Sequence, residues 1–259
     1  MNEIDGYDDI HDNVRYWVER LVVQATPTDG AIVLYDIGAN DGEVTIPAVL
    51  SLRAGTNRGN PVRIVAFEPL PAARARLITR ARECGLSFAM WGEADITIVP
   101  LALGNEDRMI ELTVYSDDTF SSLYERPDEE MERYHLEAAE VVTARMRPLD
   151  DLVRGGTVPP PDVVKIDVEG AERGVLTGAV ETLTRYTPMV VMEFSCINTA
   201  NAGYDRRELV ELLRTYGYDR FYGLYRNTDR TLRGEDSFDD CRIWNIIAGV
   251  SSKHPDLTV

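Results

Sequence analysis

The chain has 259 residues, of which 44% are hydrophobic, and this is enough to fill a substantial buried core. Acidic residues outnumber Lys and Arg by 44 to 27, giving a formal charge of -17 that repels nucleic-acid phosphates, so we expect no nucleic-acid partner. No apolar run is long enough for a membrane span, and the polar, acidic stretch Met1–Asp12 does not resemble a secretory signal. The 3 cysteines, Cys84, Cys196 and Cys241, are odd in number and widely spaced, which argues against a disulfide framework and a zinc site. We therefore expect a cytoplasmic protein without a membrane partner.

Apolar periodicity and turn residues divide the chain into alternating helices and strands. An N-terminal extension, residues 1–30, contains one amphipathic helix at His11–Ala25. Further helices are predicted at residues 43–50, 71–83, 149–153, 171–184 and 206–216. Strands are predicted at residues 31–35, 62–67, 95–101, 163–168, 189–194, 218–224 and 242–250, with additional strands at 109–115 and 141–147. This order predicts an α/β fold with a mostly parallel sheet, helices on both faces and an antiparallel closing strand.

Residues 116–140 interrupt this alternation. The segment is polar and acidic, and it contains a predicted helix at Pro127–Ala138. An insertion of this kind is typical of a substrate lid, although a merely solvated excursion explains it equally well. His135 lies in this segment as a candidate base, but a lone histidine in a polar loop is usually just solvated.

The stretch V-L-Y-D-I-G-A-N-D-G-E-V-T at residues 33–45 is typical of a nucleotide-binding turn. A buried strand leads into Asp36, and Gly38, Asn40 and Gly42 form the turn before the next helix. Glycines let the backbone approach a ligand closely, and free N–H groups at the helix start point toward it. An ordinary strand-to-helix turn is the alternative interpretation.

Acidic residues stand at the carboxyl ends of four of the predicted strands: Asp36, Glu68, Asp167 and Glu193. Ligands of such sheets bind beyond the carboxyl ends of the strands, so these side chains are expected to converge at one site. Glu68 is placed to accept hydrogen bonds from ribose hydroxyls, a role shared by several nucleotide cofactors.

The loop composition separates two cofactor classes. The dinucleotide pattern G-x-G-x-x-G is absent, because Asn40 takes the middle glycine position and Gly42 comes one place early. Asp36 and Asp41 add negative charge where a pyrophosphate would bind. An acidic rim instead suits a ligand with an ammonium and a sulfonium group, such as S-adenosylmethionine.

Three blocks in this order resemble the FkbM-type family of S-adenosylmethionine-dependent methyltransferases: D-I-G-A-N-D-G-E-V-T at 36–45, F-E-P-L-P at 67–71 and K-I-D-V-E-G-A-E-R-G-V-L-T-G-A at 165–179. The resemblance runs from about residue 31 to 250. It implies a single class I, Rossmann-like methyltransferase domain over 1–259 with a seven-stranded sheet, and O-methylation of a small-molecule hydroxyl. Secondary metabolites, as in natural product biosynthesis, and sugars are the implied substrates. Residues 124–140 depart from the family's pattern, which leaves the acceptor open.

The resemblance also implies roles for individual residues. Gly38, Asn40 and Gly42 would shape the loop around the methionine moiety, with Asp41 and Thr45 in the same motif. Asp36 would face the ammonium group directly or through water, and Glu68 would hold the ribose. Leu101 and Ala102 would border the adenine.

Asp167 is the first candidate for the general base that an alcohol nucleophile needs. A helix N-terminal acid is the alternative interpretation of Asp167, although Glu169 and Glu172 fit that capping role better. Lys165 would act as a neutral base if desolvated, but more naturally as the partner that keeps Asp167 ionised. A variant with Mg²⁺ on Asp167 and Glu193 is less favoured, because the sequence shows no tight ligand cluster, and we assign no metal ligands.

Two other classes of protein stay open. A non-catalytic S-adenosylmethionine-binding protein would keep the binding loops and lack the base. A nicotinamide-dependent oxidoreductase is disfavoured by the spacing around Asn40. The sequence does not indicate the oligomeric state.

Overall fold

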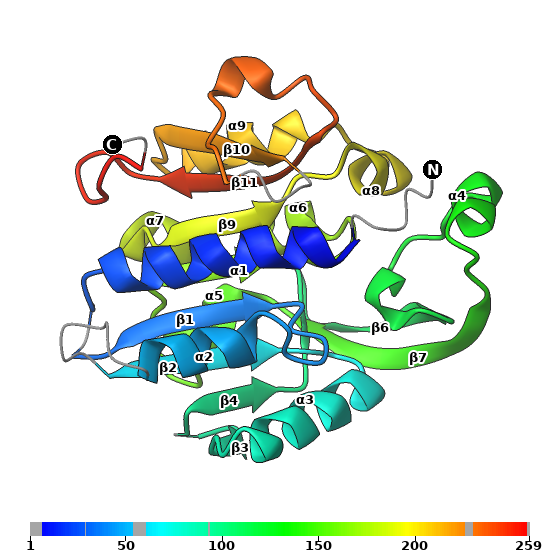
Figure 1. The fold of residues 1–259 in the computed structure, drawn as a ribbon, viewed down its shortest axis with the longest axis horizontal. Coiled ribbons are helices and arrows are strands. Elements are labelled where there is room, and N and C mark those ends of the chain that lie inside the picture. Colours follow the sequence, from blue (N-terminus) through cyan, green and yellow to red (C-terminus); the bar gives the residue numbers. More distant parts are fainter. Residues whose placement is uncertain (1–6, 29, 54–60, 93, 226–229, 258–259) are drawn as a thin grey trace.

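Helices and strands alternate along the chain, and the strands form a central sheet that is covered on both faces (Figure 1). The computed structural model describes residues 7–28, 30–53, 61–92, 94–225 and 230–257. The first residues of the acidic N-terminus, 1–6, lie outside the described residues. None of the described helices combines the length and the apolar character that crossing a bilayer requires.

The large sheet contains eight strands among the described residues. Their spatial order is β10 (Arg220–Tyr225), β11 (Ile243–Gly249), β9 (Met189–Glu193), β8 (Val163–Ile166), β1 (Ile32–Ile37), β2 (Val62–Phe67), β4 (Ile96–Val99) and β3 (Phe88–Met90). β11 runs antiparallel to both of its neighbours, and the other neighbouring pairs are parallel. The predicted class I, mostly parallel sheet with one antiparallel closing strand is confirmed, and that strand is inserted between β9 and β10. The predicted number of seven strands is one too few, because the three-residue β3 is too short to show a periodic pattern.

Side chains of each strand alternate between two hydrophobic layers. Ile32 and Leu34 of β1 pack into one layer with helices α1 (Tyr7–Gln24), α2 (Thr45–Arg53) and α3 (Pro71–Glu83). Val33 and Tyr35 pack into the other layer with α5 (Leu149–Arg154), α6 (Glu172–Thr177), α7 (Val180–Tyr186) and α9 (Arg207–Thr215). Because both faces are buried, β1 is apolar along nearly its whole length, as expected for a central parallel strand.

A second, three-stranded sheet lies beyond the carboxyl ends of the parallel strands (Figure 1). It contains β5 (Ala102–Leu103), β7 (Ala138–Arg147) and β6 (Arg108–Tyr115), with β6 and β7 antiparallel. Between β6 and β7 the chain forms the 3-10 helix η2 (Asp118–Phe120) and the short helix α4 (Asp128–Arg133). Ile110, Leu112 and Met146 of this sheet pack against Leu70 and Ala73 at the start of α3. The second sheet is thereby fixed over one side of the carboxyl edge.

Two predicted helices differ from the structure. The helix predicted at 171–184 is two helices, α6 and α7, because Gly178 between them has a low helix propensity. The helix predicted in the 116–140 segment is only α4, six residues long. A short helix after β9, α8 (Cys196–Asn201), was not predicted; Ser195 caps it by accepting a hydrogen bond from the Asn198 N–H. A further 3-10 helix, η3 (Glu235–Ser237), lies between β10 and β11.

Candidate functional site

A cleft opens at the carboxyl edge of the large sheet, between β1, β2 and β8 on one side and the second sheet on the other. It encloses about 1080 Å³, including the part that is open to solvent. Its apolar wall consists of Phe67, Leu70, Leu101, Leu103 and Leu112. Its charged residues are Asp41, Glu43, Glu68, Asp118, Lys165, Asp167 and Glu169. The cleft is therefore apolar on one wall and strongly acidic elsewhere.

The turn after β1 forms the floor of the cleft. The N–H groups of Gly38 and Ala39 donate to the Phe67 carbonyl at 3.0 and 3.1 Å, which fixes the turn against β2. Gly38 has φ +79°, and a Cβ atom there would lie 1.8 Å from the Asp167 carbonyl oxygen. Only glycine fits this position, because both the backbone conformation and the approach of β8 exclude a side chain.

Glu68 is buried at the end of β2, with 4% of its surface exposed, and it lines the cleft. One carboxylate oxygen accepts from the Asn40 N–H at 2.8 Å, and the other accepts from the Leu70 N–H at 2.7 Å. Burial raises the pKa of Glu68 to about 7, although the hydrogen bonds from Leu70 and Asn40 oppose the shift. The side chain ties the two loops around the cleft together, and its remaining lone pairs can accept from a ligand.

Lys165 on β8 lies between two carboxylates. Its Nζ is 3.1 Å from Asp36 Oδ1 and 3.5 Å from Asp167 Oδ2, and it donates to the Gly38 carbonyl at 2.9 Å. Asp36 stands beside Lys165 because β1 and β8 pair at these two residues. Burial lowers the pKa of Lys165, but Asp36 and Asp167 outweigh burial, so the pKa is raised above its ordinary value. A charged Lys165 argues against its use as a neutral base.

The predicted residues divide into those on the cleft wall and those behind it. Gly38, Asn40, Asp41, Glu68, Leu101, Ala102, Lys165 and Asp167 line the cleft. Asp36, Gly42 and Thr45 do not line it. Asp36 is 1% exposed, accepts a short hydrogen bond from the Thr45 hydroxyl and pairs with Lys165. The structure therefore places Asp36 and Thr45 behind Lys165, and not against a ligand.

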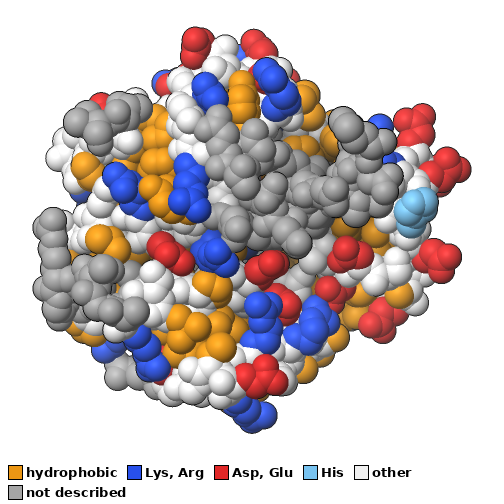
Figure 2. All heavy atoms as spheres, in the orientation of Figure 1, with side chains coloured by type: hydrophobic (Ala, Val, Ile, Leu, Met, Phe, Trp, Pro, Cys, Tyr) orange, Lys and Arg blue, Asp and Glu red, His pale blue; other side chains and the backbone are white. Residues whose placement is uncertain are grey.

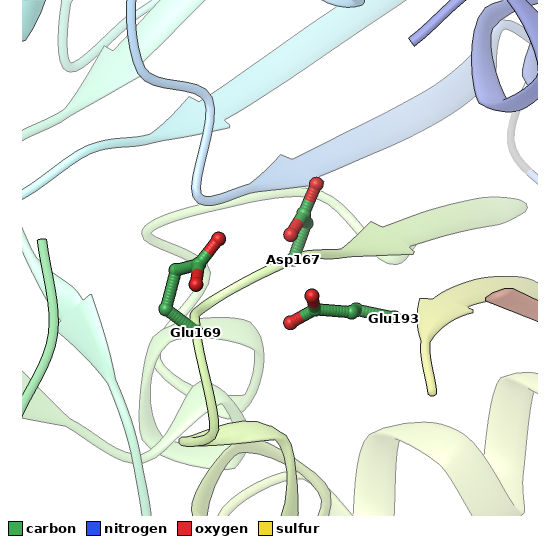
Figure 3. Close-up of side chains that lie close together, drawn as sticks. All are labelled: Asp167, Glu169 and Glu193. Atoms are coloured by element: carbon green, nitrogen blue, oxygen red, sulfur yellow. The ribbon is translucent and has the colours of Figure 1, made fainter. Parts of the chain in front are cut away.

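Three carboxylates meet beside the cleft, where β8 and β9 end. Oxygens of Asp167, Glu169 and Glu193 all lie within 4.8 Å of one another (Figure 3). Burial, together with Glu169 and Asp167, raises the pKa of Glu193 well above its ordinary value. The expectation of no tight ligand cluster is therefore wrong. It failed because Glu169 does not cap a helix: its φ of 52° and its contacts turn its side chain toward the other two acids.

Sequence reasoning missed two residues that hold this cluster. Arg126 has a 3% exposed side chain and forms short ion pairs with Glu169 and Glu130. Asn198 on α8 donates from Nδ2 to Glu169 Oε2 and to Glu193 Oε1, both at 2.9 Å. Arg126 lies in a polar segment and Asn198 in an unpredicted helix, so no periodic pattern or motif indicated either residue.

The 116–140 segment contributes part of the cleft wall. Residues Asp118, Thr119, Ser121, Ser122 and Leu123 line the cleft opposite the glycine turn. Arg76 bridges the two sides, because it donates to Asn40 Oδ1 at 2.9 Å and pairs with Asp118. His135 is exposed and is not part of the wall. Exposed acidic side chains gather at this end of the molecule, over α4 and β7 (Figure 2).

Comparison with known proteins places the chain in a family. Residues 36–220 match the Methyltransferase FkbM domain. Hexuronic acid methyltransferase AglP from Haloferax volcanii is 29% identical over 196 residues, which cover 76% of this chain and 66% of AglP. The crystal structure of methyltransferase FkbM from Methylobacillus flagellatus KT shares the fold, with a TM-score of 0.53 and 16% identity over 90% of this chain and 49% of that chain. The chain thus matches somewhat less than two thirds of AglP and about half of the Methylobacillus protein. Because the family match covers most of its length, the chain belongs to the Methyltransferase FkbM domain family.

Proposed function

We propose that the chain is one S-adenosylmethionine-dependent methyltransferase domain that methylates a hydroxyl of a small molecule, with a sugar as the first acceptor class. Family membership supports methyl transfer. The sugar acceptor is proposed because the relative AglP is a hexuronic acid methyltransferase. The observation that carries the proposal is the cleft itself, which joins an apolar wall, a buried acid at the end of β2 and an acidic interior.

The charges of the cleft fit a cationic cofactor. Acidic side chains outnumber basic ones along the described wall, where Lys165 is held by Asp36 and Asp167. A pyrophosphate would meet repulsion here, whereas a ligand with an ammonium and a sulfonium would be attracted. This difference favours S-adenosylmethionine over a dinucleotide.

Different residues of the cleft would contact different parts of the cofactor. Glu68 would accept hydrogen bonds from the ribose hydroxyls, since its carboxylate is fixed in the wall of the cleft. Leu101 and Ala102 would border the adenine, beside the apolar wall. The turn at Gly38, Asn40 and Gly42 would surround the methionine moiety. We revise the role of Asp36, which would act through Lys165 because it lies behind the wall.

Asp167 is the proposed base. Its side chain is 27% exposed and lines the cleft, so it is accessible to an acceptor. Bound S-adenosylmethionine supplies an electrophilic methyl group. Asp167 would take the proton of the acceptor hydroxyl, and the ammonium of Lys165, 3.5 Å from Asp167 Oδ2, would hold its carboxylate in position. The wall at residues 118–123 would hold the acceptor in line, and we propose this part of the 116–140 segment as the acceptor lid.

Two measurements test this proposal. Calorimetric titration of the full chain with S-adenosylmethionine and, separately, with NAD should show one binding site for the first and none for the second. Transfer of labelled methyl groups to a panel of sugars and sugar acids should identify the acceptor. Binding of NAD and not of S-adenosylmethionine would overturn the proposal. Binding of S-adenosylmethionine without methyl transfer to any hydroxyl compound would instead identify a non-catalytic cofactor-binding protein.

A further inference from the structure

We infer that Asp167, Glu169 and Glu193 form a binding site for a hard divalent cation, such as Mg²⁺, Mn²⁺ or Ca²⁺. Crowded carboxylates alone do not make such a site. Glu193 provides a second observation, because it is 3% exposed and its Oε2 has no hydrogen-bond partner among the described residues. Its carboxyl group points toward Asp167 and Glu169 (Figure 3). A buried, unpaired carboxylate oxygen is costly, so its orientation into the cluster indicates a missing partner there.

The distances fit one ion. Two oxygens bound at about 2.1 to 2.6 Å from a common cation can be separated by no more than about 4.2 to 5.2 Å. The ligand oxygens of Asp167, Glu169 and Glu193 all lie within 4.8 Å of one another. This upper limit is compatible with one shared cation, and Ca²⁺ tolerates wider oxygen separations than Mg²⁺ does. The ligands are carboxylate oxygens only, which favours a hard cation over zinc or copper.

A neighbouring side chain contacts one oxygen of each carboxylate and thereby fixes the orientation of that carboxylate. Lys165 lies 3.5 Å from Asp167 Oδ2, Arg126 pairs with Glu169 Oε2, and Asn198 donates to Glu193 Oε1 at 2.9 Å. This arrangement is typical of metal sites, where surrounding hydrogen bonds orient the ligands and leave their other oxygens for the ion.

The local charge also favours a cation. Lys165 contacts Asp167 and Arg126 contacts Glu169, but among the described residues no positive side chain forms an ion pair with Glu193. The nearby guanidinium of Arg206 is taken up by carbonyl oxygens of Phe194, Ile243 and Phe238. A bound cation would neutralise Glu193 without protonation.

The position of the site gives the ion a role, and this step rests on the proposed function. Asp167 and Glu169 both line the cleft. Mg²⁺ and Ca²⁺ take about six or more oxygen ligands, so three carboxylates leave positions for oxygens of the acceptor. A hydroxyl bound to the ion would be easier to deprotonate. The ion would also let an acidic cleft accept a sugar that carries a carboxylate.

Manganese binding tests the site without any catalytic reaction. The full chain, freed of metal by a chelator and without cofactor, is titrated with Mn²⁺, and free Mn²⁺ is followed by electron paramagnetic resonance. We expect one Mn²⁺ per chain, displaced by Mg²⁺ or Ca²⁺. Glu193→Gln should weaken binding at least about tenfold, since it removes a ligand and not merely a surrounding contact.

Glu172→Gln is the matched control. Glu172 is an equally buried acid beside the cluster, but its oxygens accept from the Val168 and Gly170 N–H groups and from the Tyr204 hydroxyl. A glutamine can keep these contacts, because its amide oxygen accepts from the two N–H groups and its nitrogen can donate to Tyr204. Affinity for Mn²⁺ should change less than threefold, on the order of the effect of a distant charge. An equal loss in both variants would show a general charge effect and overturn the site.

Thermal unfolding shows whether the variants remain folded. Mn²⁺ should raise the unfolding temperature of the wild type, because it binds only the native state. Glu193→Gln should unfold at a higher temperature than the metal-free wild type and should not respond to Mn²⁺. Absence of stoichiometric Mn²⁺ binding to the folded wild type would overturn the inference. Calorimetry with S-adenosylmethionine in the presence of chelator tests the proposed function separately, so either can fail alone.

Discussion

Buried acids at the ends of strands on the two sides of β1 have opposite surroundings. Glu68 has a backbone N–H on each of its oxygens, from Asn40 and Leu70, and therefore holds the cleft in shape. Glu193 has one oxygen on Asn198 and the other without a partner among the described residues, beside two further acids. Burial raises the pKa of both carboxyls. This difference underlies our two proposals, that the Glu68 side holds one ligand rigidly and that the Asp167–Glu169–Glu193 side is completed by a bound cation.

The largest expected effect is on the Asp167–Glu169–Glu193 side of the cleft. Asp167→Asn should lower kcat for methyl transfer by about 10² to 10⁴, because the substitution removes both the proposed proton acceptor and one proposed ligand of the cation. Calorimetry should show cofactor binding close to that of the wild type, since Glu68 is untouched. Full turnover by Asp167→Asn would remove its assignment as the base.

Lys165 lies between the two sides, and we expect its ion pair with Asp36 to stabilise the folded protein. Lys165→Met leaves Asp36 buried without its cation, and breaking a buried ion pair of this kind costs about 3 to 5 kcal/mol. Urea unfolding measures this loss. The double variant Lys165→Met with Asp36→Asn should recover part of it, because no unpaired charge is then buried. If the second substitution adds a further independent loss, the two side chains are not coupled.

On the Glu68 side, the glycine turn should tolerate no side chain. Gly38→Ala should lower the free energy of unfolding by more than the about 1 to 2 kcal/mol that the left-handed conformation alone costs. Gly203→Ala is the control, because Gly203 has φ +77° and a Cβ added there would have no atom within 4 Å, whereas one at Gly38 would contact Asp167. Equal losses in urea unfolding would show that the approach of β8 to Gly38 is not restrictive.

Glu68 should also make stability depend on pH. Its pKa in the folded protein is raised from 4.5 to about 7, so between these values the native state binds more protons than the unfolded state. The contribution of Glu68 to stability is therefore most favourable below pH 4.5 and declines as the pH rises to about 7. The stability of Glu68→Gln relative to the wild type, from urea unfolding at several pH values, should rise over this window. A difference that is constant from pH 4.5 to 8 would show that Glu68 titrates normally.

The smallest effect is expected outside both regions. His135→Ala should change the free energy of unfolding by less than about 0.5 kcal/mol, because the side chain is exposed and lies away from the cleft wall. Initial rates of methyl transfer should also be unchanged. A large loss of rate would mean that the 116–140 segment moves His135 into the site during turnover.

Much of the Glu68 side could be predicted from the sequence, because it depends on local patterns. The glycine turn, the strand that ends at Glu68 and the acids at the strand ends follow from periodicity and motif spacing. Parallel pairing of β1 with β8 then brings Asp36 beside Lys165. Asp36 was expected to face the ammonium group of the ligand, but it is buried against Lys165, because sequence position does not show whether an acid faces a ligand or a buried lysine.

The Asp167–Glu169–Glu193 side could be predicted only in part. Asp167 and Glu193 were placed at neighbouring strand ends, but Glu169 was interpreted as a helix cap. Its side chain turns inward because of contacts with Arg126 and Asn198, which lie 43 and 29 residues away in the chain. Such contacts arise from tertiary packing, and no local pattern in the sequence encodes them.

A crystal structure of the full chain with S-adenosylhomocysteine and Mn²⁺ tests the central claim most directly, because both ends of the cleft are then observed at once. We predict the ribose hydroxyls on the Glu68 carboxylate and one anomalous manganese peak within about 2.6 Å of oxygens of Asp167, Glu169 and Glu193. A nucleoside bound away from Glu68 would contradict the proposed cofactor site. Ordered carboxylates without a manganese peak would contradict the cation site.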